Sequence, residues 1–117
     1  MTMITMFGIP NCDTIKKAKK WLEAENISFE FHDYRKQGID SAMVTEFCQT
    51  LGWEQVLNKR GTTYRQLTQE QKDSLNKDNI VALLVEHPAM IKRPILKVDA
   101  QFHIGFKAEQ YAAIFNS

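Results

Sequence analysis

Cys12 occupies a position where its thiol could act as a nucleophile. It follows a short apolar run and a Pro10-Asn11 turn, and it opens a segment with helical spacing. A thiol at a helix start faces free backbone N–H groups and the positive end of the helix dipole, and both favour the thiolate. Lys16 adds positive charge and Thr14 a hydroxyl donor, whereas Asp13 opposes a second negative charge. We therefore favour a reactive Cys12 over the alternative, a small buried residue without chemistry.

The Cys12 site contains a single thiol. Position 15 is Ile, so the Cys-x-x-Cys pair is absent. The other cysteine, Cys48, lies between Phe47 and Leu51 on an apolar helical stripe, which favours a packing role and leaves a redox role as the alternative. A mixed disulfide formed at Cys12 would then need an external thiol to resolve it, from glutathione or a partner redoxin.

Basic residues that could bind an anion occur in three further places. Arg93 precedes Pro94 at the start of an apolar strand, and its planar guanidinium suits a carboxylate or an oxyanion. A basic loop over 58–65 contains Arg60, and Lys107 follows Gly105-Phe106. A solvated surface arginine is the alternative for Arg93 taken alone, but we favour the binding role opposite a helix-start thiol. We expect Arg60, Arg93 and Lys107 to form a basic rim around Cys12.

Composition excludes several classes of protein. The chain has 117 residues, a net charge of +1 and two cysteines, which disfavours a duplex nucleic-acid binder, a disulfide scaffold and a four-cysteine zinc site. The three histidines share no metal spacing, and no flavin or nucleotide motif is present, so no tightly bound cofactor is expected. The longest apolar run, 80–85, is too short to span a membrane, and the N-terminal residues lack signal-peptide features. We expect a cytoplasmic, thiol-reducing location.

The pattern of apolar residues predicts the elements that position these groups. The pattern of the first third predicts a βαβ unit, that of the middle predicts helices, and that of the end predicts two strands followed by a helix. The expected strands cover 4–9, 28–34, 94–98 and 101–104, and the main expected helices cover 12–25, 41–51, 79–86 and a segment after Gly105. These elements predict an α/β thioredoxin-like fold: a mixed four-stranded sheet with helices on both faces. We expect one domain over 1–117, with a helical insertion over about 40–88.

Four motifs together resemble a known family. They are Gly8-Ile-Pro-Asn-Cys12-Asp-Thr-Ile-Lys-Lys-Ala, His32-Asp-Tyr-Arg35, Arg60-Gly-Thr-Thr-Tyr-Arg65 and Ile91-Lys-Arg-Pro-Ile95. The chain resembles the arsenate reductase (ArsC) and Spx superfamily, the glutaredoxin-coupled branch with a thioredoxin fold, and most of all its YffB-like members. The resemblance spans essentially the whole chain.

The resemblance implies a role for individual residues. It implies a nucleophilic cysteine at Cys12 and an arginine before a cis-proline at Arg93 and Pro94. Arsenate reductases of this type use two more arginines for the oxyanion, but here Asn58 takes the middle place, with Arg60 two residues later, and Lys107 takes the last. A lysine cannot offer the bidentate fork of an arginine, so these departures disfavour arsenate as substrate. We expect Asn11, Thr14, Arg60, Arg93, Pro94 and Lys107 to bind substrate or glutathione.

Three hypotheses about function follow. The first is a glutathione-dependent thiol–disulfide reductase in which Cys12 is the nucleophile and glutathione, or a glutaredoxin, is the partner. The second is an arsenate reductase that uses glutathione and glutaredoxin. The third is a Spx-like, redox-responsive regulator that binds RNA polymerase, which Ile15 in place of a second cysteine disfavours.

Overall fold

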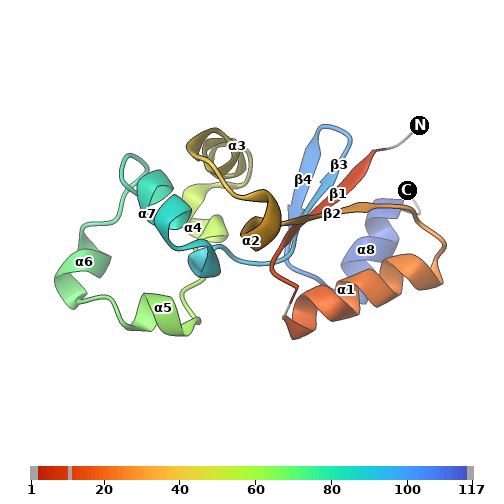
Figure 1. The fold of residues 1–117 in the computed structure, drawn as a ribbon, viewed down its shortest axis with the longest axis horizontal. Coiled ribbons are helices and arrows are strands. Elements are labelled where there is room, and N and C mark those ends of the chain that lie inside the picture. The colour runs from red at the N-terminus through yellow and green to blue at the C-terminus, as the bar shows by residue number, and fades with distance from the viewer. Residues whose placement is uncertain (1–2, 11, 116–117) are drawn as a thin grey trace. The chain divides into compact units, whose positions relative to one another are not determined.

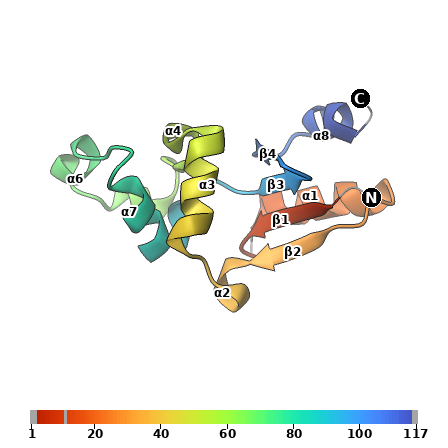
Figure 2. The ribbon, with the colours of Figure 1, turned by 90° about the horizontal axis from the view of Figure 1, so that it is seen from above.

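The chain folds into two compact units, which are described separately. The computed structural model describes residues 3–10 and 12–115. The first unit holds the described residues up to Gln37 and from Arg93 onward, and the second unit is Gly38–Lys92. Figures 1 and 2 show the elements of each unit from two directions. No helix among the described residues is long and apolar enough to cross a membrane.

The first unit is built on a mixed four-stranded sheet. Its strands are β1 (Ile4–Gly8), β2 (Glu30–Asp33), β3 (Ile95–Val98) and β4 (Gln101–Ile104). They lie in the order β2-β1-β3-β4, with β1 and β2 parallel and the other two pairs antiparallel. The parallel pair needs a crossover, which helix α1 (Asp13–Ala24) supplies, whereas a short turn joins β3 to β4. This arrangement confirms the thioredoxin-like fold expected from the sequence.

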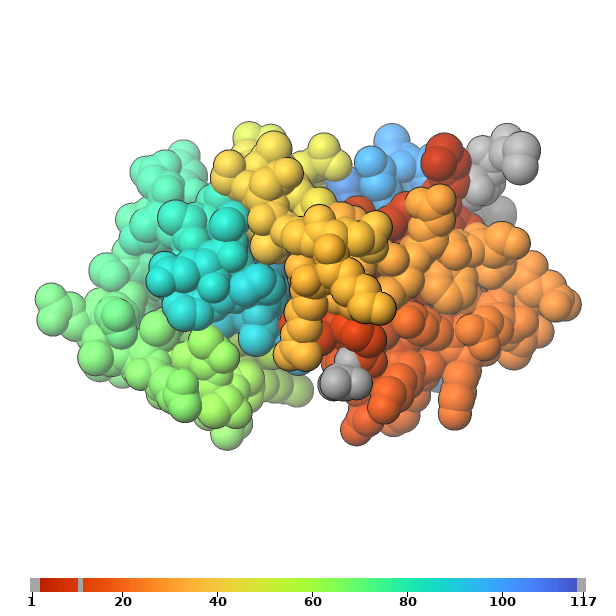
Figure 3. All heavy atoms as spheres, in the orientation of Figure 1, coloured from red at the N-terminus to blue at the C-terminus, as the bar shows by residue number. Residues whose placement is uncertain are grey.

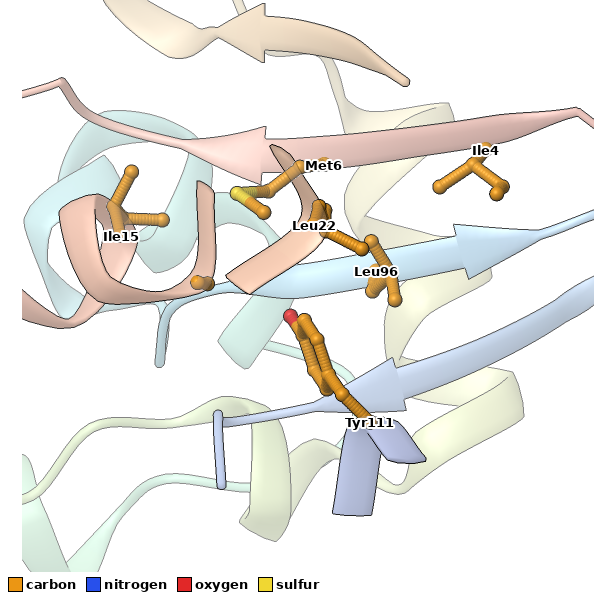
Figure 4. Close-up of a cluster of buried hydrophobic side chains, with 7 residues drawn as sticks. Ile4, Met6, Ile15, Leu22, Leu96 and Tyr111 are labelled. Atoms are coloured by element: carbon orange, nitrogen blue, oxygen red, sulfur yellow. The ribbon is translucent and has the colours of Figure 1, made fainter. Parts of the chain in front are cut away.

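The core of the first unit lies on one face of this sheet. Met6 and Leu96 are direct partners in the β1–β3 register, so their side chains share a face. Ile15 and Leu22 from α1 and Tyr111 from α8 (Ala108–Phe115) pack against them, and all five are fully buried (Figure 4). The sequence analysis expected helices on both faces of the sheet. Instead, both long helices of this unit cover the same face.

Strand register brings three chain segments to one end of the sheet. Gly8, at the end of β1, pairs with Asp33 at the end of β2, and Phe7 pairs with Ile95 at the start of β3. The segment after β1, which leads to Cys12, therefore starts at the same end of the sheet as the segment after β2 and the segment before β3.

The second strand ends one residue earlier than the sequence pattern predicted. Tyr34 begins the short helix α2 (Tyr34–Gln37) instead of closing the strand. The Asp33 carboxylate explains the change of direction, because its Oδ1 accepts the Arg35 N–H at 2.9 Å. The Gln37 side chain completes the turn by accepting the Asp33 N–H at 3.0 Å. Such side-chain bonds compete with the strand ladder and start a turn.

The second unit is helical. Its helices are α3 (Ser41–Leu51), α4 (Trp53–Val56), α5 (Thr62–Arg65), α6 (Gln69–Asp73), α7 (Ile80–Glu86) and the 3-10 helix η1 (Pro88–Met90). Its buried side chains come from α3, α4, α7 and η1 and from the residues that directly follow α4 and η1. They are Val44, Phe47, Val56, Leu57, Ile80, Leu84, Met90 and Ile91. An isolated bridge pairs Leu57 with Ile91, and the Lys92 N–H donates to the Val56 carbonyl at 2.7 Å.

Side chains cap two helices of this unit. Asp40 accepts the Met43 N–H at 2.8 Å and starts α3. Thr68 and Gln71 form a reciprocal capping box at the start of α6. Each cap satisfies helix N–H groups that would otherwise lack a partner, which typically contributes about 1 kcal/mol.

Candidate active site

Cys12 lies at the N-cap of α1. Its backbone is extended, with φ −131° and ψ 126°, and its carbonyl accepts the first helical bond from the Lys16 N–H at 3.0 Å. The side chain is half-buried and packs against the apolar core of the first unit. It does not form a close capping hydrogen bond, but its sulfur faces the first turn of the helix, where backbone N–H groups are free.

The surroundings of Cys12 lower the pKa of its thiol. Burial is the largest influence and raises the pKa, because it disfavours the charged thiolate. The backbone N–H of Ile15, the side chain of Arg93 and the backbone N–H of Thr14 act in the other direction, because donor groups near the sulfur favour its charged form. The positive charge of Arg93 adds to their effect, and the net pKa lies below the value of a free thiol. At neutral pH a larger fraction of Cys12 is therefore the nucleophilic thiolate.

Gly8 allows this first turn of α1 to pack closely on the end of β1. A Cβ at Gly8 would lie 2.6 Å from Ile15 Cδ1 and 3.8 Å from Arg93 Cβ. Ile15 is fully buried, so its side chain would have to repack to make room for that Cβ. Because the Ile15 N–H is also one of the groups that lower the Cys12 pKa, a bare backbone at Gly8 helps to position the thiol's donors. Gly8 was quoted in the family motif, but its spacing gave no sign of this role.

Arg93 and Pro94 lie just before β3, whose first residue, Ile95, pairs with Phe7 near the end of β1. The peptide bond between them is cis, as the family resemblance implied. Pro94 is buried, and its carbonyl accepts the Gly105 N–H at 2.9 Å, which ties the segment to the end of β4. Arg93 is half-buried and reaches the Cys12 sulfur. Of the residues expected to bind substrate, Arg93 and Thr14 are thus brought to the thiol.

The other expected binding residues have different surroundings. Lys107 is exposed just before α8, where its carbonyl accepts the Tyr111 N–H at 3.0 Å. Arg60 belongs to the second unit, is exposed, and donates its backbone N–H to Asn58 Oδ1 at 3.1 Å. Asn11 lies outside the described residues. The basic rim of Arg60, Arg93 and Lys107 therefore stays a prediction, and of the three residues only Arg93 acts on the pKa of the thiol.

The exposed face of α1 carries further positive charge. Lys16, Lys17 and Lys20 are exposed on it, and the surface of this helix is orange in Figure 3. Lys19 instead lies over the Phe31 ring, with its Nζ 3.6 Å from the ring centroid. Lys16 was expected to add positive charge near the thiol. Lys16 lies on this exposed face, but it is not among the described groups that shift the pKa of Cys12.

Cys48 has surroundings opposite to those of Cys12. It lies on α3, half-buried, beside a cavity of about 360 Å³ whose lining includes Trp53 and Lys77. Burial raises the pKa of its thiol. At neutral pH Cys48 is therefore protonated and a poor nucleophile. No group of three or more His, Cys, Asp or Glu side chains suited to a metal ion occurs among the described residues.

The strand order of the sheet and the single cysteine at the start of α1 define a thioredoxin-like protein. Its thiol lies at a helix N-terminus, where the surroundings favour a nucleophilic thiolate. A family model described as ArsC family matches residues 7–114. The chain belongs to the ArsC family.

Individual relatives agree with this assignment. A Haemophilus influenzae protein, described as uncharacterized, is 46% identical over 97% of this chain and 99% of its own length. The global transcriptional regulator Spx of Streptococcus agalactiae is 26% identical over 95% of this chain and 82% of its own. The chain therefore has Spx homologues, which span most of its length.

Two solved structures share both fold and sequence. One is described as a YFFB protein; it superposes with a TM-score of 0.90 and 40% identity over 95% of this chain and 97% of that one. The other is an arsenate reductase (ArsC) related protein from Brucella melitensis, with a TM-score of 0.81 and 42% identity over 98% and 96%. The resemblance to YffB-like and arsenate-reductase-related proteins is thus confirmed.

Proposed function

We propose that this protein is a glutathione-dependent thiol–disulfide reductase with Cys12 as its only nucleophile. The observation that carries the proposal is the set of donors around the Cys12 sulfur: two backbone N–H groups of α1 and the Arg93 guanidinium, which together lower the pKa of the thiol. These donors stabilise a thiolate in a half-buried site, which is what a nucleophilic cysteine needs and a packing cysteine does not.

The reaction proceeds through two exchanges. The Cys12 thiolate attacks one sulfur of a substrate disulfide, so a Cys12–sulfur bond forms, the substrate's sulfur–sulfur bond breaks and one thiolate leaves. A glutathione thiolate then attacks the mixed disulfide and restores Cys12. When the retained half is glutathione from the substrate, this second product is oxidised glutathione, and each turnover consumes one free glutathione and releases the other half of the substrate as a thiol. An external thiol is needed because residue 15 is Ile and the Cys48 thiol has a raised pKa.

The other residues predicted to bind substrate supply positive charge at the thiolate or hold neighbouring groups in position. Arg93 stabilises the attacking and the leaving thiolate, and its fork also suits a carboxylate of glutathione. Thr14 contributes its backbone N–H to the thiolate, and Pro94 holds the strand start that carries Arg93. Asn11, Arg60 and Lys107 are proposed to contact glutathione or the partner glutaredoxin.

Turnover of a glutathione mixed disulfide tests this proposal directly. Oxidised glutathione is measured with glutathione reductase and NADPH, with Cys12→Ser and Cys48→Ser as matched variants. Cys12→Ser abolishes turnover while the protein stays folded, and Cys48→Ser retains turnover. Activity that survives in Cys12→Ser rules the mechanism out.

Arsenate reduction is a second candidate, favoured by the 42% identity to the arsenate-reductase-related protein from Brucella melitensis. In this case the Cys12 thiolate attacks arsenic, and glutathione with glutaredoxin supplies the two electrons that reduce arsenate to arsenite. Asn58 and Lys107 disfavour it, because neither offers the bidentate contact of arginine. No arsenate turnover with both reductants present removes this candidate.

The Spx relatives favour testing a regulatory role as well. A Spx-like chain would bind RNA polymerase and use its thiol as a sensor. Recovery of polymerase with the tagged protein at low salt, lost after oxidation of Cys12, is the result this role requires. Failure to recover polymerase leaves the enzyme as the stronger proposal.

A further inference from the structure

The exposed face of α1 carries a cluster of lysines that begins one helical turn after Cys12. Lys16, Lys17 and Lys20 are exposed, and we call these three residues the α1 lysine face. The Lys16 N–H donates to the Cys12 carbonyl at 3.0 Å, so Lys16 lies one turn beyond Cys12, and Lys20 lies one turn beyond Lys16. Cys12, Lys16 and Lys20 therefore form one row along the helix, about 12 Å long.

The three lysines are not paired with carboxylates of the described chain. Within residues 3–10 and 12–115, none of the three ammonium groups forms an ion pair. Asp13 precedes Lys17 by four residues, the spacing at which helical side chains meet, but both side chains are exposed and they do not pair. Lys19 differs from the other three, because its Nζ lies over the Phe31 ring. The charge of the α1 lysine face is therefore available to an approaching partner.

The charges of α1 are distributed in the opposite way to the one that helix stability favours. Residues 13–20 contain four lysines and one carboxylate, whereas residues 21–25 contain two glutamates and no basic residue. The helix dipole favours anions near the N-terminal end and cations near the C-terminal end. Solubility needs a polar outer face, but it does not need the positive charges at the end that holds the thiol. This arrangement therefore points to an interaction at the Cys12 end of the helix.

The sign and the extent of the α1 lysine face define the partner. Three unpaired lysines attract carboxylates, and a disulfide that reacts with Cys12 must approach this end of α1. An extended tripeptide such as glutathione spans about 10 Å, and its sulfur is on the central residue. Its carboxylates therefore reach only the start of the row, near Lys16. Contact with Lys17 and Lys20 as well requires a larger anionic surface, such as that of an acidic protein.

We propose that the α1 lysine face is a docking surface for acidic proteins whose cysteine is joined to glutathione in a mixed disulfide. Carboxylates beside that cysteine face the lysines while the Cys12 thiolate attacks the glutathione sulfur. A Cys12–glutathione disulfide forms, the bond to the protein's sulfur breaks, and that sulfur leaves as a thiolate; free glutathione then restores Cys12 and yields oxidised glutathione. This inference rests on the proposed function, because it names the substrate class of the same thiol.

Three synthetic peptides serve as probes. Each contains one cysteine in a mixed disulfide with glutathione, and the cysteine is flanked by glutamates, by glutamines or by lysines. Turnover is followed as oxidised glutathione with glutathione reductase and NADPH, at about 20 mM and about 500 mM salt. At low salt kcat/KM for the glutamate peptide exceeds that for the glutamine peptide by about three- to tenfold, and the lysine peptide is the slowest. At high salt the three values converge, because salt screens exposed charges.

Two triple variants show whether the preference comes from the α1 lysine face. Lys16→Gln, Lys17→Gln and Lys20→Gln together remove the charge and keep a similar helix propensity, and the ratio of the glutamate to the glutamine peptide falls to near one. The matched variant with arginine at the same three positions keeps the charge and the preference. Iodoacetamide is neutral, and the pH midpoint of Cys12 alkylation stays the same in both variants, since none of the three lysines shifts the pKa of the thiol.

Three results would overturn the inference. They are equal rates for the glutamate and glutamine peptides at low salt, a preference that survives in the triple glutamine variant, and a preference that is lost in the triple arginine variant. Failure of the proposed function looks different. In that case Cys12→Ser turns over all three peptides as fast as the unsubstituted protein does, and the inference falls with it.

Discussion

The guanidinium of Arg93 reaches the Cys12 thiol from the start of β3, across the end of β1. Cys12 and Arg93 are 81 positions apart in the sequence, and the antiparallel pairing of β1 with β3 brings them together. Arg93 contributes both a hydrogen bond and a positive charge to the sulfur. The reactivity of the thiol therefore depends on a side chain from the other half of the first unit.

Removal of the Arg93 side chain lowers the rate at which the Cys12 thiol reacts. Arg93→Ala raises the pKa of Cys12 and lowers its alkylation rate at pH 7 by roughly three- to tenfold, because a charge-assisted hydrogen bond to the thiolate is lost. Arg93→Lys keeps the charge and has a smaller effect. Arg35→Ala is the control, since Arg35 is an exposed arginine of the same unit that does not act on Cys12. Equal rates in Arg93→Ala and Arg35→Ala would refute the role of Arg93.

The two cysteines differ in reactivity. Because the pKa of Cys12 is lowered and burial raises that of Cys48, limited iodoacetamide at neutral pH labels Cys12 roughly tenfold faster. Peptide mass spectrometry after brief labelling measures the ratio. Cys12→Ser removes the fast phase and Cys48→Ser leaves it intact. Faster labelling of Cys48 would show that the order of the two pKa values is wrong.

Gly8 and Ile15 form a tightly packed pair whose coupling can be measured. Gly8→Ala destabilises the protein by about 1–3 kcal/mol, because the new Cβ would lie 2.6 Å from Ile15 Cδ1. Ile15→Val deletes that methyl group and by itself costs about 0.5–1.5 kcal/mol. The double variant loses less than the sum, by about 0.5 kcal/mol or more, as denaturant unfolding can show. Simple additivity would mean that the two positions are not in contact.

Stability depends on pH through Cys12. Its folded pKa is lowered, so between that value and the unfolded value of about 8.5 the unfolded chain binds more protons. The stabilisation is present above the unfolded pKa and is lost as pH falls through the folded pKa. The free energy of unfolding of the wild type minus that of Cys12→Ser therefore increases as pH rises from the lowered folded pKa to above the unfolded value of about 8.5. Cys48 is common to both chains and cancels; a difference that stays flat or falls contradicts the assigned direction.

The helix-start position of Cys12 could be predicted from the sequence because its causes are local. An apolar run, a Pro-Asn turn and helical spacing occur within a few residues of one another. The caps at Asp40 and Thr68 were predictable for the same reason. The parallel pairing of β1 with β2 followed from the crossover helix and the antiparallel pairing of β3 with β4 from the short turn, whereas the pairing of β1 with β3 was not predicted.

The end of the second strand at Asp33 was not predictable, because the side-chain hydrogen bonds that turn the chain there leave no mark on the alternation of residue types. Aromatic and polar residues alternate through 28–34, so the pattern predicted a strand through Tyr34, and only the hydrogen bonds of Asp33 show that the strand ends before it. The sequence also did not determine which face of the sheet α8 covers, because the apolar stripe of this helix can pack against either face. For Arg60, loop composition predicts a basic surface but carries no information on its distance from the thiol.

The pH dependence of Cys12 alkylation tests the central claim most directly. A Cys48→Ser chain gives a single thiol, and its alkylation rate is measured across the pH range that covers the ionisation of free cysteine. A stabilised thiolate gives a midpoint clearly below the value of about 8.5 for a free thiol, and this midpoint shifts upward in Arg93→Ala. A midpoint at or above that value, unchanged by Arg93→Ala, would contradict this claim.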